Sequence, residues 1–288
     1  MIIKRVKDGE KENLNGCVVD PCIRITAFFT VFEEQFNENY YFCGETHDFW
    51  EFVCVLDGVL GVTAGKDIFL LEQGQALLHK PMEFHRLWSE NQTKPRIIIF
   101  SFVADIMPYM KERRFTLKEE WIHILHGLIE RRDSIFDVKG GLEIIKIKPG
   151  KSIQAHIFVS EFEDILLKSL EQKERWILPF TSQSAQNYRK IVRILDEHLD
   201  EQLTLSKLAE LAQMSQSAIK KTFSKYTGIG VMAYFNQIKV QKAVSLLKAG
   251  KSVGEIAEQL GFSDQNYFST VFKRVTGYSP LQYMKELR

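Results

Sequence analysis

Three polar side chains in the N-terminal half, His47, Glu51 and His85, have the chemistry to hold a small molecule or a metal ion. Because alternate residues of a strand point to the same side, a strand here would place His47, Phe49 and Glu51 on one face. The opposite face would carry Trp50, Phe52 and Cys54. Polar groups beside an aromatic ring in an apolar segment are typical of a pocket wall that orients a ligand. We therefore expect His47, Phe49, Glu51 and His85 to line a pocket for a small polar organic molecule, such as a sugar or another metabolite.

Two other interpretations of the same residues stay open. His47, Glu51 and His85 are chemically suitable as metal ligands. However, a straight strand would hold His47 and Glu51 about 13 Å apart, so a shared ion would require a bend. Alternatively, the three side chains only hydrogen-bond to one another and stabilise the fold. We expect neither a metal nor another cofactor.

The C-terminal third contains an internal repeat. Leu205-Ser-Lys-Leu-Ala-Glu-Leu-Ala, with Phe223-Ser-Lys-Tyr-Thr-Gly downstream, recurs as Val253-Gly-Glu-Ile-Ala-Glu-Gln-Leu with Phe272-Lys-Arg-Val-Thr-Gly. Ala209 matches Ala257 and Phe223 matches Phe272, with offsets that differ by one residue, so the second copy has one extra residue near its turn. Each copy predicts a helix, a turn that opens on a serine (Ser215 or Ser263), and a second helix that ends at a Thr-Gly cap.

This pattern predicts two helix-turn-helix units that bind double-stranded promoter DNA. A small alanine lets the second helix cross the first closely, which leaves the outer face of the second helix free to enter the major groove. Residues 183–288 contain 15 Lys/Arg and 9 Asp/Glu, whereas the remainder holds 23 and 28. The segment 231–248 predicts an 18-residue helix, about 27 Å long, which can hold two recognition helices in successive major grooves. A plain helical bundle is the alternative.

The rest of the sequence predicts a β-rich N-terminal domain and a polar linker. Short runs of branched and aromatic residues between Gly and Pro residues suggest an antiparallel barrel or sandwich over residues 23–103. The predicted strands are Ile23–Phe32, Phe49–Leu56, Val59–Thr63, Asp67–Leu71, Gln75–His79 and Arg96–Phe102. Residues 105–175 are mostly helical, and the apolar stripe of Ile153–Leu170 is our expected seam of a homodimer. The domains are then 1–175 for ligand sensing and dimerisation, 176–187 as linker, and 188–288 for DNA binding.

Composition places the chain among ordinary globular proteins without a targeting segment. The chain has 288 residues, of which 45% are hydrophobic and 26% charged. It has no apolar run of about 18 residues and no signal-peptide core, so we expect a cytoplasmic protein that does not contact a membrane.

The closing segment, Gly261-Phe-Ser-Asp-Gln-Asn-Tyr-Phe-Ser-Thr-Val-Phe-Lys-Arg-Val-Thr-Gly-Tyr-Ser-Pro with Tyr283, resembles the C-terminal signature of AraC-type transcription regulators. The resemblance covers about Tyr188–Arg288 and implies sequence-specific DNA binding without enzymatic activity. One departure is Gln213, which stands where the first turn usually has a small residue. Matched by position, the residues implied to read bases are Ser217, Lys220, Lys221, Gln265, Asn266, Ser269 and Thr270. Those implied to contact phosphate are Lys225, Lys239, Lys273 and Arg274.

The N-terminal half resembles, over a shorter pattern, the cupin-like sensor domain of the same family. The residues that carry this resemblance are His47-Asp-Phe-Trp-Glu51, Gly58, Gly74 and Pro81-Met-Glu-Phe-His85. The implied fold class is α+β, with a cupin-like barrel and trailing helices before an all-α domain of two helix-turn-helix units joined by a long helix. A metal-dependent cupin enzyme is the competing interpretation. Such enzymes usually have a histidine where this chain has Glu45, which argues against it.

Overall fold

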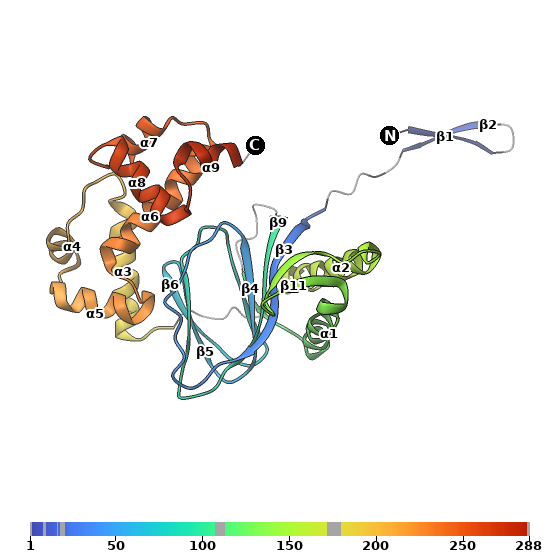
Figure 1. Ribbon diagram of the computed structural model, residues 1–288, viewed down its shortest axis with the longest axis horizontal. Coiled ribbons are helices and arrows are strands. Elements are labelled where there is room, and N and C mark those ends of the chain that lie inside the picture. The colour runs from blue at the N-terminus through green and yellow to red at the C-terminus, as the bar shows by residue number, and fades with distance from the viewer. Residues whose placement is uncertain are drawn as a thin grey trace.

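The structure is a computed structural model that describes residues 2–7, 10–15, 17, 21–106, 113–171 and 180–286. Strands dominate the first half of the chain, and helices make up the described part beyond residue 180 (Figure 1). In the described part, no helix is long and apolar enough to cross a membrane.

The N-terminal half forms two main antiparallel sheets rather than a single continuous one. The larger sheet has seven strands in the order β10-β7-β4-β9-β3-β12-β11, and the smaller has the order β6-β5-β8. The larger sheet comprises β3 (Ile23–Gln35), β4 (Trp50–Asp57), β7 (Gln75–His79), β9 (Arg96–Ile106), β10 (Arg114–Thr116), β11 (Phe136–Lys139) and β12 (Glu143–Ile147). The smaller sheet comprises β5 (Leu60–Ala64), β6 (Asp67–Leu71) and β8 (His85–Ser89), and a separate hairpin pairs β1 (Ile2–Lys7) with β2 (Glu10–Asn15). The predicted bounds of β6 and β7 are confirmed.

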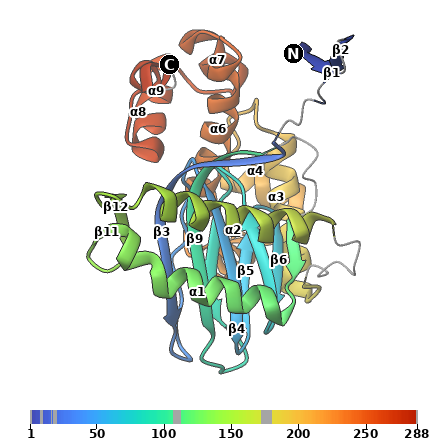
Figure 2. The same cartoon turned by 90° about the vertical axis from the view of Figure 1, so that its right-hand side faces the viewer.

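The larger sheet is covered on both faces, which explains why β4 is apolar along nearly its whole length. One face packs against the smaller sheet through residues such as Val53 and Leu87. The other face, which carries Phe52 and Cys54 as the alternation predicts, packs against α1 (Glu119–Ile135) and α2 (Ser152–Glu171). Figure 2 shows these two helices crossing the sheet.

The expected dimer seam on α2 is wrong in its central residues. Phe158 and Phe162 are fully buried in the core between α2 and the sheet. Phe162 stacks on Phe100 of β9 with ring centroids 4.3 Å apart. Burying each phenyl ring stabilises the fold by about 1.5–3 kcal/mol, so this stripe serves the chain's own core.

The C-terminal half consists of seven helices in the described part of the chain. They are α3 (Gln183–Glu197), α4 (Leu205–Ala212), α5 (Gln216–Thr227), α6 (Val231–Lys248), α7 (Val253–Gln259), α8 (Gln265–Thr276) and α9 (Pro280–Glu286). α6 spans the 18 residues that the sequence predicts. One core cluster joins α3, α4, α5 and the first half of α6, and a second joins the remainder of α6 to α7, α8 and α9. α6 is therefore shared by two helical subdomains.

Local capping explains where the paired helices begin and end. Ser215 caps α5 by accepting a hydrogen bond from the Ala218 N–H. In the second copy the cap is Asp264, the residue after Ser263, which accepts the bond from the Tyr267 N–H. This one-residue displacement is the extra residue that the repeat predicts. Both α5 and α8 end at left-handed glycines, Gly228 and Gly277.

Of the expected linker 176–187, residues 176–179 lie outside the described residues. The remainder overlaps the first helix of the C-terminal half, because α3 already begins at Gln183, capped by Ser182. Tyr188, the expected start of the DNA-binding domain, is fully buried inside α3.

Candidate ligand pocket and DNA-binding surface

A cavity of about 430 Å³ opens between the two sheets. This volume is in the range of small-molecule sites. Its wall includes Phe49, Glu51 and His85, three of the four expected pocket residues. Its other lining residues are Thr30, Phe32, Glu34, Phe36, Tyr40, Phe42, Glu45, Leu87, Ile99, Ser101 and Leu142. The lining therefore combines aromatic and aliphatic surface with three carboxylates, and none of these lining residues is Lys or Arg.

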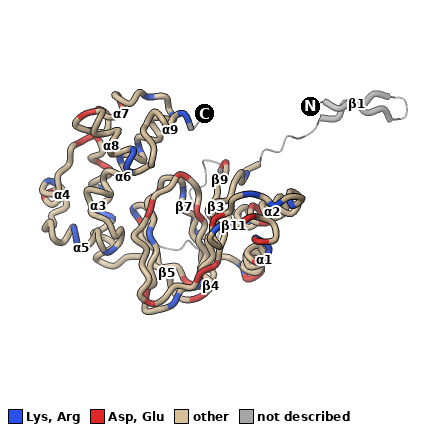
Figure 3. The backbone as a smooth tube through the Cα atoms, in the orientation of Figure 1, with Lys and Arg blue, Asp and Glu red and all other residues tan. Residues whose placement is uncertain are grey.

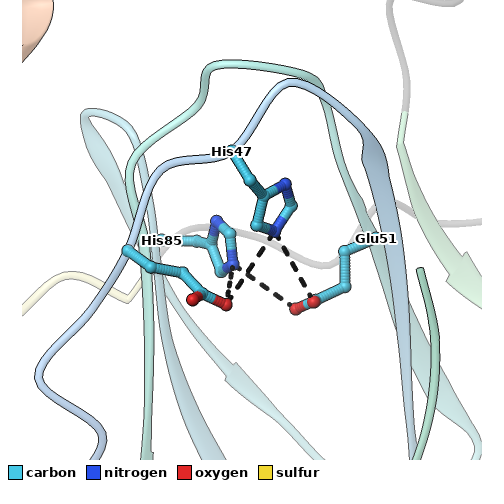
Figure 4. A group of neighbouring side chains, drawn as sticks. His47, Glu51 and His85 are labelled. Atoms are coloured by element: carbon cyan, nitrogen blue, oxygen red, sulfur yellow. Dashed lines mark ion pairs between the residues drawn. The ribbon is translucent and has the colours of Figure 1, made fainter. Parts of the chain in front are cut away.

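The fourth expected residue, His47, is not among the lining residues, but it is stacked on Phe49, which is, with ring centroids 3.7 Å apart. Its Nε2 lies 3.7 Å from Glu51 Oε2 (Figure 4). The 13 Å separation of a straight strand does not apply, because β4 begins at Trp50 and His47 lies in the segment before it. That segment folds back, so the two side chains converge.

Glu45 completes this cluster, although the sequence pattern did not assign it to the pocket. Its Oε1 lies 3.6 Å from His85 Nε2 and 3.9 Å from His47 Nε2. The backbones of Glu45 and His85 exchange two hydrogen bonds, which fixes the two side chains next to each other. The signal in the sequence is the spacing Glu45-X-His47-X3-Glu51, where Glu45 stands in the place of the usual cupin histidine.

Burial and the histidines compete in setting the charge of Glu51. Burial alone would raise the pKa of Glu51, but the adjacent His47, His85 and His79 lower this pKa to about 2. Burial lowers the pKa of His85, whereas Glu45 and Glu51 raise it to about 9. The Ser101 hydroxyl donates a further hydrogen bond to Glu51 Oε2 at 3.2 Å. The carboxylate of Glu51 is therefore ionised and requires a cation beside it.

A second buried polar group lies behind the cluster and was also missed. His79 is fully buried and stacked on His85 with ring centroids 4.4 Å apart. Its Nδ1 lies 3.4 Å from Glu83, whose carboxylate accepts two hydrogen bonds from Arg113. Burial and the charge of His85 lower the pKa of His79 to about 4. This group supports the wall that carries His85.

The base-reading residues expected on α5 and α8 lie largely at the surface. Ser217, Lys220, Lys221, Gln265, Asn266 and Thr270 are exposed, and Ser269 is half-buried. The inner faces are buried through Ile219 and Phe223 on α5 and Phe268 and Phe272 on α8. α5 and α8 carry Lys220, Lys221, Lys225, Lys273 and Arg274 and no acidic residue (Figure 3). Their outer faces thus suit a polyanion.

Two further exposed residues were missed on these faces. Gln216 occupies the first position of α5, which corresponds to Gln265 on α8, and its Nε2 donates to Ser206 Oγ. Tyr267 in the first turn of α8 is 46% exposed. The offset of 49 residues between the second helices would have identified Gln216.

The expected phosphate contact of Lys239 is wrong. This side chain is only 3% exposed, and its ammonium group donates to the carbonyl oxygens of Glu201 and Leu260, each at 2.7 Å. Leu260 follows α7, and Glu201 lies between α3 and α4. Lys239 therefore ties α6 to the segment before α4 and to the end of α7, and its ammonium group is not available to DNA.

The sheet that forms one wall of the pocket also contacts α5. Arg86 on β8 donates to the carbonyl oxygens of Ser224 (3.0 Å) and Lys225 (2.7 Å), and Thr63 on β5 donates to that of Tyr226 (2.5 Å). These carbonyls belong to the last turn of α5, where most carbonyl groups lack a partner within the helix; that of Ser224 also accepts the Gly228 N–H. A positive charge is also favourable at a helix C-terminus. The N-terminal half thus fixes the end of the first recognition helix.

α3 and α6 contact the same small sheet. The hydroxyl groups of Tyr188 and Tyr234 donate to the Gly65 carbonyl at 2.7 and 3.3 Å. Arg189 pairs with Asp67, and Phe84 packs edge-on against Tyr234. The contact between the halves is therefore a combination of apolar packing and directed hydrogen bonds.

Both halves of the chain match known protein families. Residues 30–127 match the AraC-like ligand binding domain, and residues 208–286 match a helix-turn-helix domain. The HTH-type transcriptional activator RhaR of Mannheimia succiniciproducens is 24% identical over 82% of this chain and 85% of its own length. The bifunctional transcriptional activator/DNA repair enzyme AdaA of Bacillus subtilis is 34% identical over 32% of this chain and 44% of its own length. Among solved structures, ToxT of Vibrio cholerae is 16% identical, covers 92% of this chain and 97% of its own, and has a TM-score of 0.37.

A ligand-binding domain followed by a helix-turn-helix domain defines a one-chain DNA-binding regulator. The chain belongs to the AraC-type transcription regulators.

Proposed function

We propose that this chain regulates transcription by binding promoter DNA through both helix-turn-helix units, and that a small polar molecule in the N-terminal pocket alters this binding. The observation that carries the proposal is the shared strand β8. His85 lines the pocket, and the next residue, Arg86, holds the end of α5. Because successive residues of a strand point to opposite faces, β8 lines the pocket with one face and contacts α5 with the other.

On the DNA side, we assign base reading to Ser217, Lys220, Lys221, Gln265, Asn266, Ser269 and Thr270. Lysine can donate to guanine, and Gln or Asn can pair with adenine in the major groove. We assign phosphate contacts to Lys225, Lys273 and Arg274, which are all exposed. The relatives RhaR and AdaA are named as transcriptional activators, which supports the same role here.

Fluorescence anisotropy of the full chain on DNA from upstream of its own coding region tests this function. Each neutralised phosphate releases counterions, so log K should fall with log salt by about 0.9 per contact. The double variant Lys273→Ala/Arg274→Ala should bind more weakly and show a shallower slope. Lys94→Ala is the surface-charge control, because Lys94 is exposed in the N-terminal half and pairs with Glu38. A salt-independent affinity, or equal effects of both variants, would refute the proposed DNA contact.

A thermal-shift screen with sugars and polar metabolites tests the sensor. A molecule that binds only the folded chain at 100 times its Kd stabilises it by about 2.7 kcal/mol. A genuine effector should also change DNA affinity in the anisotropy assay. If every molecule that raises the Tm leaves the DNA affinity unchanged, the proposal that the pocket regulates DNA binding is refuted.

A further inference from the structure

Four side chains that could each offer one ligand atom to a metal ion converge at the pocket. One nitrogen of His47, one of His85, and one oxygen each from Glu45 and Glu51 all lie within 4.8 Å of one another. His47, Glu51 and His85 point toward a common centre in Figure 4. The side chains of His85 and Glu51 are only 1% and 8% exposed, whereas that of Glu45 is 48% exposed at the mouth of the group. The cluster is therefore anchored on two buried side chains and is not a surface acidic patch.

The hydrogen bonds on the far side of each imidazole identify which nitrogen carries the proton. His47 Nδ1 lies 3.1 Å from the Phe49 carbonyl oxygen, and His85 Nδ1 lies 3.0 Å from that of Glu83. A carbonyl oxygen only accepts, so Nδ1 is the donor in both rings. In the neutral rings the lone pairs then lie on Nε2, which faces the cluster. A backbone carbonyl on Nδ1 is the usual way in which a metal-binding histidine is oriented.

The distances favour a metal ion over a proton between these groups. Both Nε2 atoms are buried and have no hydrogen-bond partner among the described residues. Their separations from the carboxylate oxygens are 3.4–3.9 Å, whereas a charged N–H···O bond closes to about 2.7–2.9 Å. A tetrahedral ion with bonds of about 2.1 Å holds neighbouring ligand atoms about 3.4 Å apart. The separations between the imidazole nitrogens and the carboxylate oxygens are therefore close to those around a coordinated ion.

We propose that Glu45, His47, Glu51 and His85 bind one divalent first-row transition metal ion. Two neutral imidazoles and two carboxylates balance a charge of +2 and suit Zn²⁺, Mn²⁺, Fe²⁺ or Co²⁺ better than Ca²⁺ or Mg²⁺, which prefer oxygen ligands alone. This proposal departs from the sequence-based expectation that the chain holds no metal. Ser101, which donates to Glu51, and the stacked ring of Phe49 hold the ligands in place.

The site deepens the proposed sensing function, although metal binding itself does not depend on DNA binding. Glu45, Glu51 and His85 line the cavity, so a molecule in the pocket can reach the ion. The nearby carboxylates would repel an acid if the pocket were metal-free, whereas a bound ion favours oxygen donors. The effector class that fits is therefore a small hydroxylated or carboxylated molecule that coordinates the metal.

Isothermal titration of the chelator-treated full chain with ZnCl₂, MnCl₂ and CoCl₂ tests the site. We expect one equivalent of saturable binding, and visible absorption of the Co²⁺ form that reports nitrogen and oxygen ligands. Glu51→Gln and Glu45→Gln, which keep the side-chain shape, should each weaken binding at least tenfold. His123→Gln is the control, because His123 is exposed on α1 and lies outside the cluster. Glu45 is half-exposed, so its variant should fold even if that of Glu51 does not.

Absence of saturable binding, or binding that both Glu variants retain, would overturn the metal site. DNA affinity of the same samples separates the two proposals. If the chelator-treated protein still binds DNA specifically but takes up no metal, the metal site is refuted and the proposed regulatory function stands. Protein that binds one metal ion but no DNA supports the site and refutes the proposed function.

Discussion

Single residues explain how the two helix-turn-helix units differ. Gln213 and Gly261 both adopt left-handed backbone conformations after the first helix of each unit, with φ of 53° and 58°. At Gly261 a Cβ atom would lie 2.2 Å from the Asp200 carbonyl oxygen, so glycine is required by both conformation and space. At Gln213 the backbone is strained, but the side chain is exposed.

We predict opposite effects of exchanging these residue types. Gly261→Ala should destabilise the chain by at least about 2 kcal/mol, because it adds a backbone clash to the left-handed strain. Gln213→Gly should be neutral or stabilise by up to about 1 kcal/mol, since the strain that it removes is partly offset by the flexibility of glycine in the unfolded chain. Urea unfolding followed by circular dichroism measures both. A tolerated Gly261→Ala would contradict the close approach to Asp200.

Because Lys239 is buried, we predict that the stability of the chain depends on pH. Burial lowers the pKa of Lys239 from 10.5 to about 8, although Asp200 and Glu201 act to raise it. Below pH 8 this lysine is charged in both the folded and unfolded chains, and the cost of burying its charge is present in full. Between pH 8 and 10.5 the unfolded chain binds more protons, so this contribution to stability rises with pH.

The free energy of unfolding of the native chain, relative to Lys239→Met, should therefore increase from pH 7.5 to pH 10. Lys242→Met is the control, because Lys242 is exposed on the same helix. A native-minus-variant difference that is flat or falls with pH would show that the burial of Lys239 is misassigned.

At the scale of elements, the connection between β8 and α5 links ligand sensing to DNA binding. Arg86 donates to Phe42, Ser224 and Lys225, so it joins the pocket wall to the end of the first recognition helix. Arg86→Met should lower stability by about 1–3 kcal/mol, because the carbonyl groups of Phe42 and Lys225 lose the donor that they have in this partly buried contact. It should also change DNA affinity several-fold, since α5 is no longer held in one orientation.

Arg24→Met provides the matched comparison. Arg24 forms an exposed ion pair with Asp105 and lies outside this contact, so its loss should cost less than about 1 kcal/mol and leave DNA affinity unchanged. If both variants change stability and DNA affinity equally, the contact between β8 and α5 does not couple the pocket to DNA binding.

The elements that repeat or alternate could be predicted from sequence, and those that depend on tertiary contacts could not. The bounds of α6, β6 and β7 followed from periodicity and flanking glycines. The hairpin of β11 and β12 was missed within a segment expected to be helical, because Glu143–Ile147 is a mostly exposed strand without a clear buried face. Lys239 was misassigned because sequence does not show that two backbone carbonyls surround it.

Part of the candidate pocket could also be predicted from the sequence. Phe49, Glu51 and His85 were placed in the pocket by alternation and by resemblance, and the cavity contains them. Glu45 was missed because its position depends on a bridge to His85, forty residues away in the chain. The bend just before β4, beyond which His47 lies close to Glu51, was likewise not visible in the local sequence pattern.

At the scale of the whole molecule, the outer face of α2 is the predicted surface for self-association. Ile153 and Ile157 are 75% and 46% exposed, and Ile145 and Ile147 on the neighbouring β12 are 51% and 46% exposed. We predict a homodimer at micromolar concentration by light scattering. Ile153→Lys/Ile157→Lys should shift it toward monomer without unfolding it. A native chain that is monomeric under these conditions would refute the dimer.

The claim that both helix-turn-helix units read DNA is tested most directly by selecting binding sites for the full chain from randomised DNA duplexes. We predict two enriched blocks whose centres lie about 10–10.5 base pairs apart, one for α5 and one for α8. In Gln265→Ala/Asn266→Ala, preference should be lost by about 1–3 kcal/mol at defined positions of one block, while the other block persists. A single enriched block, or no enrichment above random, would contradict base reading by both units.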